Sequence, residues 1–241
     1  MMSQAKVILI CGYRRTGKDT FFNKLSSGSP EHLFRWRAYK KSPDIKIVED
    51  PPLTYNRISF GDFLKEEAAI VYGIPRDIPD DEKDVKQFNP RYNNREIGGK
   101  CESTEHTGTL LSPRDIYVEW GAIRRSQDPD YWCREAFIPH ERLFRGDTGS
   151  DKASSNRDCY VVTDWRFRNE SRYVMARFSD VLTVRLYRSE VPEPDPNIES
   201  EHDLDSYCTD VVLLRDNIDG EFDKMVEKFP QYTDYLPYET L

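Results

Sequence analysis

Short, continuous apolar runs alternate along this chain with longer stretches in which apolar residues recur every three or four positions. The first run covers residues 6–11, and Phe21, Phe22 and Leu25 follow it at helical spacing. Continuous apolar runs are typical of parallel strands buried on both faces, and the recurring spacing is typical of amphipathic helices. The alternation predicts an α/β fold in which helices cover both faces of a parallel sheet.

The same pattern gives approximate positions for the elements. The expected strands cover residues 6–11, 56–60, 159–163, 181–187 and 211–214. The expected helices follow the first strand to about residue 28 and then cover residues 62–72, 112–125, 130–143, 170–178 and 221–229. Ser112 followed by Pro113 marks the start of the third helix, because serine caps helices and proline favours their first turn. The pattern assigns no element after residue 230.

At 241 residues the chain fits one domain, residues 1–241, with a sizeable hydrophobic core. Three polar segments interrupt the pattern. Residues 29–55 look inserted, residues 74–112 are expected to form a loop beside the substrate, and residues 188–205, rich in proline and acidic residues, form a candidate lid. Residues 34–41 interleave cations with aromatic rings, which fits an edge strand or a loop with solvated charges better than a base-stacking surface.

The net charge of -8 and the isoelectric point near 5.2 argue against broad binding to nucleic acid, which needs a basic surface. A small anionic substrate must then be held by a local cluster of arginine and lysine. The five cysteines are odd in number and widely spaced, as in a reducing compartment. No stretch is apolar enough for a leader or a membrane span, so we expect a cytoplasmic protein without membrane partners. A homodimer is the default oligomer, because it is the commonest.

Residues 12–20, GYRRTGKDT, stand where the first strand should pass into a helix. Gly12 and Gly17 allow a tight turn whose backbone N–H groups point inward, and Lys18 is placed to reach the β- and γ-phosphates of a nucleotide. The helix N-terminus adds partial positive charge. This pattern predicts a polyphosphate cradle, and the alternative is a glycine-punctuated turn with a solvated basic rim.

Asp19 stands where this motif usually has a serine or threonine that binds Mg²⁺. A carboxylate is also a hard oxygen ligand, so we expect Asp19 to bind Mg²⁺, with Thr20 sharing the role. Asp164 and Arg166 follow the third expected strand. Ligands bind beyond the carboxyl ends of such strands, so if this strand neighbours the first, Asp164 lies near Mg²⁺ and Arg166 near a phosphate. The alternatives are a helix cap for Asp164 and surface ion pairs for Arg166.

Phosphoryl transfer depends mainly on positioning and on neutralising the charge of the migrating group, so cations must approach from several directions. The candidates on the donor side are Lys18, Arg14, Arg15, Arg166 and Arg188. The candidates on the acceptor side are Lys65, Arg114 and Arg124, each of which could instead lie on a solvated helix face.

Four stretches, GYRRTGKDT, SFGDFLKEEA, SPRDIYVEWGAIRRSQDPDYW and VVTDWRFRNE, resemble in this order the deoxynucleoside monophosphate kinases of large phages and DNA viruses. The resemblance reaches from the first strand to the helix after Glu170 and continues weakly to the last strand. It implies a three-layer P-loop fold like that of nucleoside monophosphate kinases. It also implies transfer of the γ-phosphoryl group of ATP, with Mg²⁺, to a deoxynucleoside monophosphate.

The loop motif and the resemblance together assign roles to particular residues. The nucleotide site would consist of Gly12, Arg14, Arg15, Thr16, Gly17, Lys18, Asp19, Thr20 and Arg188, with Asp19, Thr20 and Asp164 as metal ligands. The acceptor site would consist of Lys65, Arg114, Gly121, Trp132, Asp164, Arg166 and Glu170. The catalytic groups would be Lys18, Arg15, Asp164 and Arg166.

The helix after Arg114 departs from the family. It carries EWGA at residues 119–122 where the family often has a glutamine and a Gly-Thr pair, which leaves base selectivity open. The chain is also similar to animal-type phosphomevalonate kinases, which share the GKD loop, a strand-end aspartate with a nearby arginine, and a stretch like residues 199–205. An isoprenoid phosphate is therefore an alternative acceptor, and a nucleotide-binding protein without catalysis is the other alternative.

Overall fold

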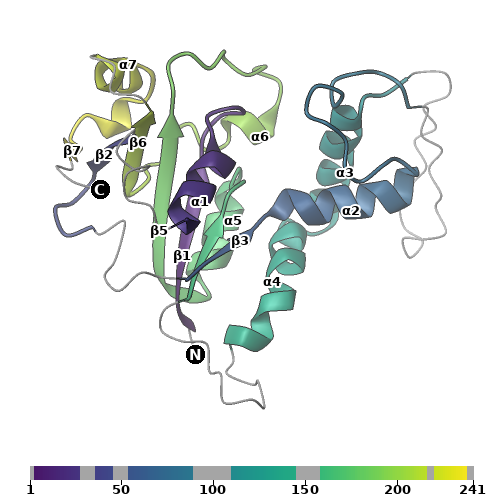
Figure 1. Ribbon diagram of the computed structural model, residues 1–241, viewed down its shortest axis with the longest axis horizontal. Helices are drawn as coiled ribbons and strands as arrows, with labels where there is room; N and C mark the ends of the chain where they lie inside the picture. The colour runs from purple at the N-terminus through teal and green to yellow at the C-terminus, as the bar shows by residue number, and fades with distance from the viewer. Residues whose placement is uncertain are drawn as a thin grey trace. The chain divides into compact units, whose positions relative to one another are not determined.

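The computed structural model describes residues 3–27, 36–45, 54–88, 110–144, 158–215 and 220–237. The contacts within the chain divide it into two compact units. The first comprises residues 1–59 and 137–241 and contains the sheet, and the second comprises residues 60–136, whose described elements are helices. Figure 1 shows these elements coloured by their order in the sequence.

The described residues of the first unit form a seven-stranded sheet. In spatial order its strands are β3 (Thr54–Ile58), β4 (Asp158–Val162), β1 (Ser3–Cys11), β5 (Phe178–Tyr187), β6 (Val211–Arg215), β2 (Trp36–Lys40) and β7 (Leu236–Pro237). The five strands from β3 to β6 are parallel, which confirms the α/β class and the parallel arrangement expected from the apolar runs. In this register Leu9 of β1 lies opposite Val162 of β4.

One side of the sheet differs from the parallel arrangement that the sequence predicts. β2 pairs antiparallel with β6, from Trp36 opposite Arg215 to Lys40 opposite Val211, and β7 pairs antiparallel with β2. A strand in the 34–41 stretch is thus confirmed, but it is not the edge strand, because β7 from the C-terminal segment covers it. The prediction that β6 is the last strand was wrong for the same reason.

Helices cover both faces of this sheet, as expected. The helices that lie wholly in this unit are α1 (Lys18–Ser26), α5 (Arg168–Met175), α6 (Glu199–His202), α7 (Glu221–Lys228) and the short 3-10 helix η2 (Pro230–Tyr232). Because alternate residues of a strand point to opposite faces, neighbouring positions belong to different clusters. Phe21 of α1 packs in the cluster that contains Ile8 and Leu213, whereas Met225 of α7 packs in the cluster that contains Val212.

The second unit contains α2 (Phe60–Tyr72), α3 (Pro113–Gln127) and the beginning of α4 (Tyr131–Phe144), which continues into the first unit. Ser112 caps α3 as expected: its Oγ accepts from the backbone N–H of Asp115 at 3.1 Å, and the Asp115 carboxylate accepts from the Ser112 N–H at 2.9 Å. Helices α2 and α3 pack closely at Gly121, where an added Cβ would lie 2.9 Å from the Leu64 side chain.

Several element ends differ from the sequence prediction by two or three residues. β3 ends at Ile58 and α2 begins at Phe60, whereas we expected the strand to reach residue 60 and the helix to start at 62. β5 begins at Phe178, three residues before the predicted start, because the exposed Ser179 and Asp180 interrupt its apolar run. The expected polar segments 29–55 and 74–112 lie partly outside the described residues.

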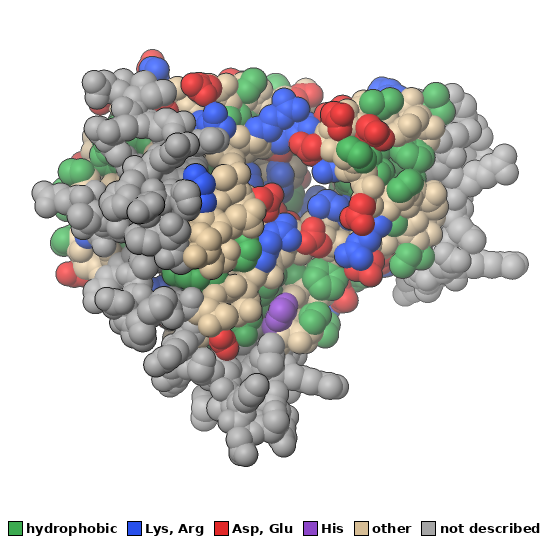
Figure 2. All heavy atoms as spheres, viewed as in Figure 1, with side chains coloured by type: hydrophobic (Ala, Val, Ile, Leu, Met, Phe, Trp, Pro, Cys, Tyr) green, Lys and Arg blue, Asp and Glu red, His purple; other side chains and the backbone are tan. Residues whose placement is uncertain are grey.

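The described surface carries charges of both signs. On the face that Figure 2 shows, basic side chains lie beside acidic ones rather than forming a broad area of one sign. Among the described helices, none is both long and apolar enough to cross a membrane.

Candidate functional site

Residues 12–17, the 12–17 loop, connect the end of β1 to the start of α1. The loop takes three left-handed backbone conformations, with φ of 143° at Gly12, 67° at Arg15 and 96° at Gly17. A Cβ at Gly12 would lie 2.5 Å from the carbonyl oxygen of Leu186 in the neighbouring β5, so only glycine fits there. Thr16 fixes the turn, because its Oγ1 donates to the Tyr13 carbonyl at 2.9 Å. The loop is therefore a tight turn packed on β5.

Lys18, the first residue of α1, turns its ammonium group back onto this loop. Its Nζ donates to the carbonyl oxygens of Gly12 at 2.5 Å and Tyr13 at 2.9 Å. Burial, together with the nearby Arg166 guanidinium, lowers the pKa of Lys18 to about 8. A phosphate beside this ammonium would raise the pKa again, since an opposite charge favours the protonated amine.

Asp164 and Arg166 follow β4, and β4 lies directly beside β1 in parallel. The condition set by the sequence is met, so these residues share the edge of the sheet with the 12–17 loop. Asp164 accepts a hydrogen bond from the Ser59 hydroxyl at 2.8 Å. It does not cap the following helix, whose N-cap is Phe167.

Glu170 has a clear structural role in the turn that carries Arg166. Its carboxylate accepts from the backbone N–H of Arg166 at 2.8 Å and of Phe167 at 3.0 Å, and the residue is 5% exposed. A glutamate three positions after an N-cap commonly reaches back in this way. In this structure Glu170 therefore positions the Arg166 backbone, whereas the resemblance assigns it to the acceptor.

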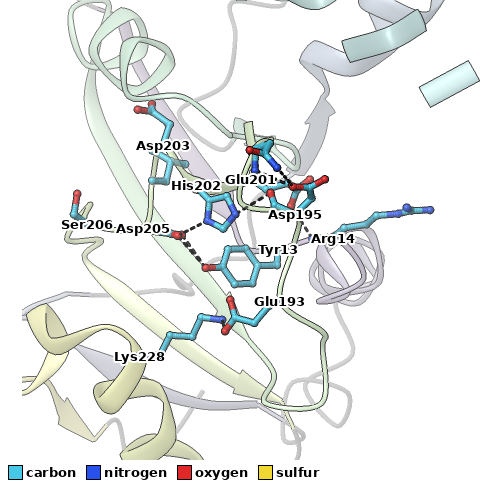
Figure 3. A network of polar contacts seen from close by, with 12 residues as sticks. Tyr13, Arg14, Glu193, Asp195, Glu201, His202, Asp203, Asp205, Ser206 and Lys228 are labelled. Atoms are coloured by element: carbon cyan, nitrogen blue, oxygen red, sulfur yellow. Dashed lines mark hydrogen bonds and ion pairs between the residues drawn. The ribbon is translucent and has the colours of Figure 1, made fainter. Parts of the chain in front are cut away.

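Glu201 of α6 joins the two parts of the site. Its Oε2 accepts from the backbone N–H of Arg14 in the 12–17 loop at 3.2 Å, and its Oε1 is paired with the Arg166 guanidinium. The Glu201 side chain is 10% exposed. Figure 3 shows Glu201 beside the loop, within a network that also includes Tyr13. One carboxylate thus bridges a loop amide and a strand-end arginine.

A second set of contacts fastens the loop to the segment that follows β5 (Figure 3). The Tyr13 hydroxyl donates to both carboxylate oxygens of Asp205 at 3.0 Å. Asp205 also bonds Nδ1 of His202 at 2.8 Å, and this contact raises the pKa of His202. The Lys228 ammonium lies 4.4 Å from the centre of the Tyr13 ring and pairs with Glu193 at 2.5 Å. His202 and Asp205, within the candidate lid, therefore lie against Tyr13 of the loop.

A buried arginine supports this segment from the sheet. Arg185 of β5 is 2% exposed, donates to the Tyr232 hydroxyl at 2.8 Å, and bonds the carbonyl oxygen of Leu204. Its guanidinium also lies 4.7 Å from the centre of the Phe229 ring. These contacts compensate the burial of its charge and hold the backbone just before Asp205.

The remaining residues assigned to the nucleotide and the metal lie around the loop. Arg188 donates to the carbonyl oxygen of Arg15 at 3.3 Å and pairs with Glu190 at 3.0 Å. Asp19 pairs with Arg57 at 3.3 Å, and both Asp19 and Thr20 are exposed.

The sequence assigns Mg²⁺ to the oxygen groups of Asp19, Thr20 and Asp164. The described residues contain no group of three or more His, Cys, Asp or Glu placed to hold a metal ion. Mg²⁺ in phosphoryl-transfer sites is commonly bound by one or two carboxylates together with phosphate oxygens and water. Asp19 and Asp164 could supply those carboxylates, and Thr20 a hydroxyl oxygen.

Four residues assigned to the acceptor belong to the second unit, where each has local partners. Lys65 pairs with Asp62 at 3.2 Å, and Arg114 pairs with Asp84 at 2.6 Å. The buried Trp132 donates from Nε1 to the carbonyl oxygen of Gly121 at 3.3 Å. The structure thus gives Gly121 and Trp132 packing roles in this unit, and their assignment to an acceptor stays a prediction.

Arg124, the other acceptor-side candidate, is not on a solvated helix face. Its guanidinium lies between the rings of Trp120 and Tyr131, at 4.8 and 4.7 Å from their centres, and it is paired with Glu67. Tyr131 donates its hydroxyl to the same Glu67 oxygen at 3.1 Å. Glu67 carried no sequence signal of this role.

No protein-family model matches this sequence, and no curated protein matches it. The residues that sequence reasoning missed at the loop are Glu201, Asp205 and Tyr13. Residues 199–205 stood out as part of the candidate lid and as a similarity to another kinase family. Nothing in their spacing identified Glu201 or Asp205 as contacts of a loop almost two hundred residues earlier.

Proposed function

We propose that this chain is a P-loop kinase that transfers the γ-phosphoryl group of ATP, with Mg²⁺, to a deoxynucleoside monophosphate. The observation that carries the proposal is the convergence of anion donors on Glu201. The Arg14 amide comes from the end of β1 and the Arg166 guanidinium from the end of β4, yet both reach one carboxylate. Donors that meet on one carboxylate are suitably spaced for the oxygens of a phosphate group.

The residues of the site match what phosphoryl transfer demands from a protein. ATP supplies the phosphoryl group when bound, and Mg²⁺ neutralises charge on its oxygens. The loop amides and Lys18 would hold the β- and γ-phosphates, with Arg15 and Arg188 at the rim. Arg166 would stabilise the charge of the migrating group, and Asp19, Thr20 and Asp164 would hold the metal. The reaction needs a site that excludes water, and residues 188–205 would act as the lid that excludes it.

The choice of acceptor comes from the sequence resemblance. A deoxynucleoside monophosphate agrees with the four stretches that resemble the viral and phage kinases. One structural observation favours a second candidate, an isoprenoid phosphate. The stretch shared with animal-type phosphomevalonate kinases, residues 199–205, places Glu201 and Asp205 against the 12–17 loop.

The decisive experiment is ADP formation from ATP and Mg²⁺ with a panel of acceptors. The panel contains dTMP, dGMP, dCMP, dAMP, their ribose counterparts and mevalonate phosphate. We expect activity with one or more deoxynucleotides and its loss in Lys18→Ala, which leaves the sheet unchanged. Activity with mevalonate phosphate alone would select the second candidate.

ATP binding without any acceptor-dependent ADP would instead indicate a nucleotide-binding protein. Near-normal turnover in Lys18→Ala would defeat the assignment of the loop. Circular dichroism and a thermal melt of this variant separate loss of chemistry from loss of fold.

A further inference from the structure

Glu201 places a negative charge where the proposed function requires a phosphate. Both of its oxygens are used: one accepts from the Arg14 amide of the 12–17 loop and the other pairs with Arg166. Its side chain is 10% exposed, whereas Glu199, in the same short helix, is exposed. The site therefore already holds an anion that belongs to the chain.

The charges around Glu201 account for this position. Arg166 and Lys18 lie close enough for each to influence the other, and the Arg166 charge lowers the pKa of Lys18. Glu201 acts in the opposite sense, because a carboxylate near the ammonium favours its charged form. Without a ligand, Glu201 thus compensates two cations that would otherwise repel each other.

A phosphate that uses the same donors cannot share them with Glu201. Two anions at one site repel, and the Arg14 amide has only one hydrogen to give. Either the carboxylate leaves when the phosphate arrives, or the phosphate binds more weakly than the donors allow. The neighbouring contact of Tyr13 is made with Asp205 and not with Glu201. Glu201 can therefore move away from the loop while the Tyr13–Asp205 contact remains.

Building on the proposed function, we propose that Glu201 is an autoinhibitory anion that occupies the phosphate position and is displaced by the polyphosphate of the nucleotide. Displacement breaks the contact of Glu201 with the loop and releases Arg166 to face the phosphate. If Glu201 occupies the phosphate position in about nine of ten ligand-free molecules, removing its charge tightens polyphosphate binding by about tenfold.

The test is calorimetric titration of the full chain with magnesium tripolyphosphate at pH 7. It compares the wild type with Glu201→Gln, which removes the charge and keeps the shape. The matched control is Glu199→Gln, which removes the same charge from the exposed position on the same helix. We expect about tenfold tighter binding for Glu201→Gln and less than a twofold change for Glu199→Gln.

Hydrogen exchange on the wild type provides a readout that needs no variant. Tripolyphosphate should slow exchange in the 12–17 loop and speed it in α6, because the bond from the Arg14 amide to Glu201 is lost. Greater protection of α6 on binding would overturn the proposal, since it would mean that Glu201 closes onto the ligand.

The other outcomes separate this inference from the proposed function. If the wild type binds tripolyphosphate and Glu201→Gln binds it equally well or more weakly, the autoinhibitory role is overturned and the polyphosphate site stands. If neither protein binds tripolyphosphate, the autoinhibitory role and the proposed polyphosphate site are both overturned. Binding that appears only in Glu201→Gln supports both.

Discussion

The Tyr13 hydroxyl donates to both carboxylate oxygens of Asp205, which stands 192 positions later in the chain. Tyr13 is 8% exposed and belongs to the 12–17 loop, whereas Asp205 follows α6. The conformation of the loop and the position of the segment after β5 are therefore linked. A substitution at either residue should therefore alter the conformation around the other.

Replacing Tyr13 with Phe removes this link and keeps the ring. The partly buried hydroxyl donates to a carboxylate, so its loss should lower the free energy of unfolding by about 1–2 kcal/mol. Urea denaturation measures the change. Tyr39→Phe is the control, because the stacking of its ring on Phe222 is retained. An equal effect of the two substitutions would contradict a special role for the Tyr13 contact.

The contact of His202 with Asp205 should make stability depend on pH. The hydrogen bond to Asp205 raises the pKa of His202 in the folded state above the ordinary histidine value. Its contribution is therefore fully present below about pH 6.5 and is lost as the pH rises through the raised folded-state pKa. We expect the difference in unfolding free energy between wild type and His202→Gln to be larger at pH 6 than at pH 8.5. A difference that grows toward pH 8.5 would contradict this sign.

Lys18 should titrate well below an ordinary lysine. Burial lowers its pKa to about 8, whereas an unfolded lysine titrates near about 10.4. Between these values the unfolded chain binds more protons, so the contribution of Lys18 to stability rises with pH. After reductive ¹³C-methylation, one lysine resonance should titrate near pH 8 and be missing in Lys18→Arg.

Magnesium tripolyphosphate should move that titration to higher pH, because a neighbouring anion favours the ammonium form. The lowered pKa is refuted if every lysine resonance titrates at ordinary alkaline pH. If the Lys18 resonance still titrates with a midpoint near pH 8 after tripolyphosphate is added, the anion binds elsewhere.

Arg166→Ala should reduce the turnover number strongly if the proposed kinase activity is found. Removing a donor that stabilises developing charge typically costs about 3 kcal/mol, or roughly a hundredfold in rate. The measurement separates kcat from KM, because a role in the transition state lowers kcat. Arg172→Ala, on the exposed side of α5, is the control. A loss smaller than about threefold would remove Arg166 from the reaction.

Local pattern was enough to predict the elements that depend on neighbouring residues in the chain. The apolar runs predict β1, β4, β5 and β6, because strands buried on both faces are apolar at most positions. Ser112 and Pro113 predict the start of α3, where Ser112 and Asp115 cap each other. The same rule could have identified Glu170 as the group that holds the turn at Arg166, since it stands three positions after the N-cap.

The elements that sequence reasoning missed depend on partners far away in the chain. β7 is two residues long and has no period, so only its pairing with β2 makes it a strand. The antiparallel direction of β2 likewise depends on β6.

The sequence by itself determined the α/β class, the glycine-bounded turn between β1 and α1, and the basic and acidic residues beside it. Only the tertiary structure decided that β4 lies next to β1, that Glu201 bridges Arg14 and Arg166, and that Asp205 holds Tyr13. The physical reason is that the hydrophobic periodicity of helices and buried strands is carried by residues that are neighbours in the chain. The position of a carboxylate 187 residues away is fixed instead by the packing of the whole unit, including the buried Arg185 that anchors Leu204.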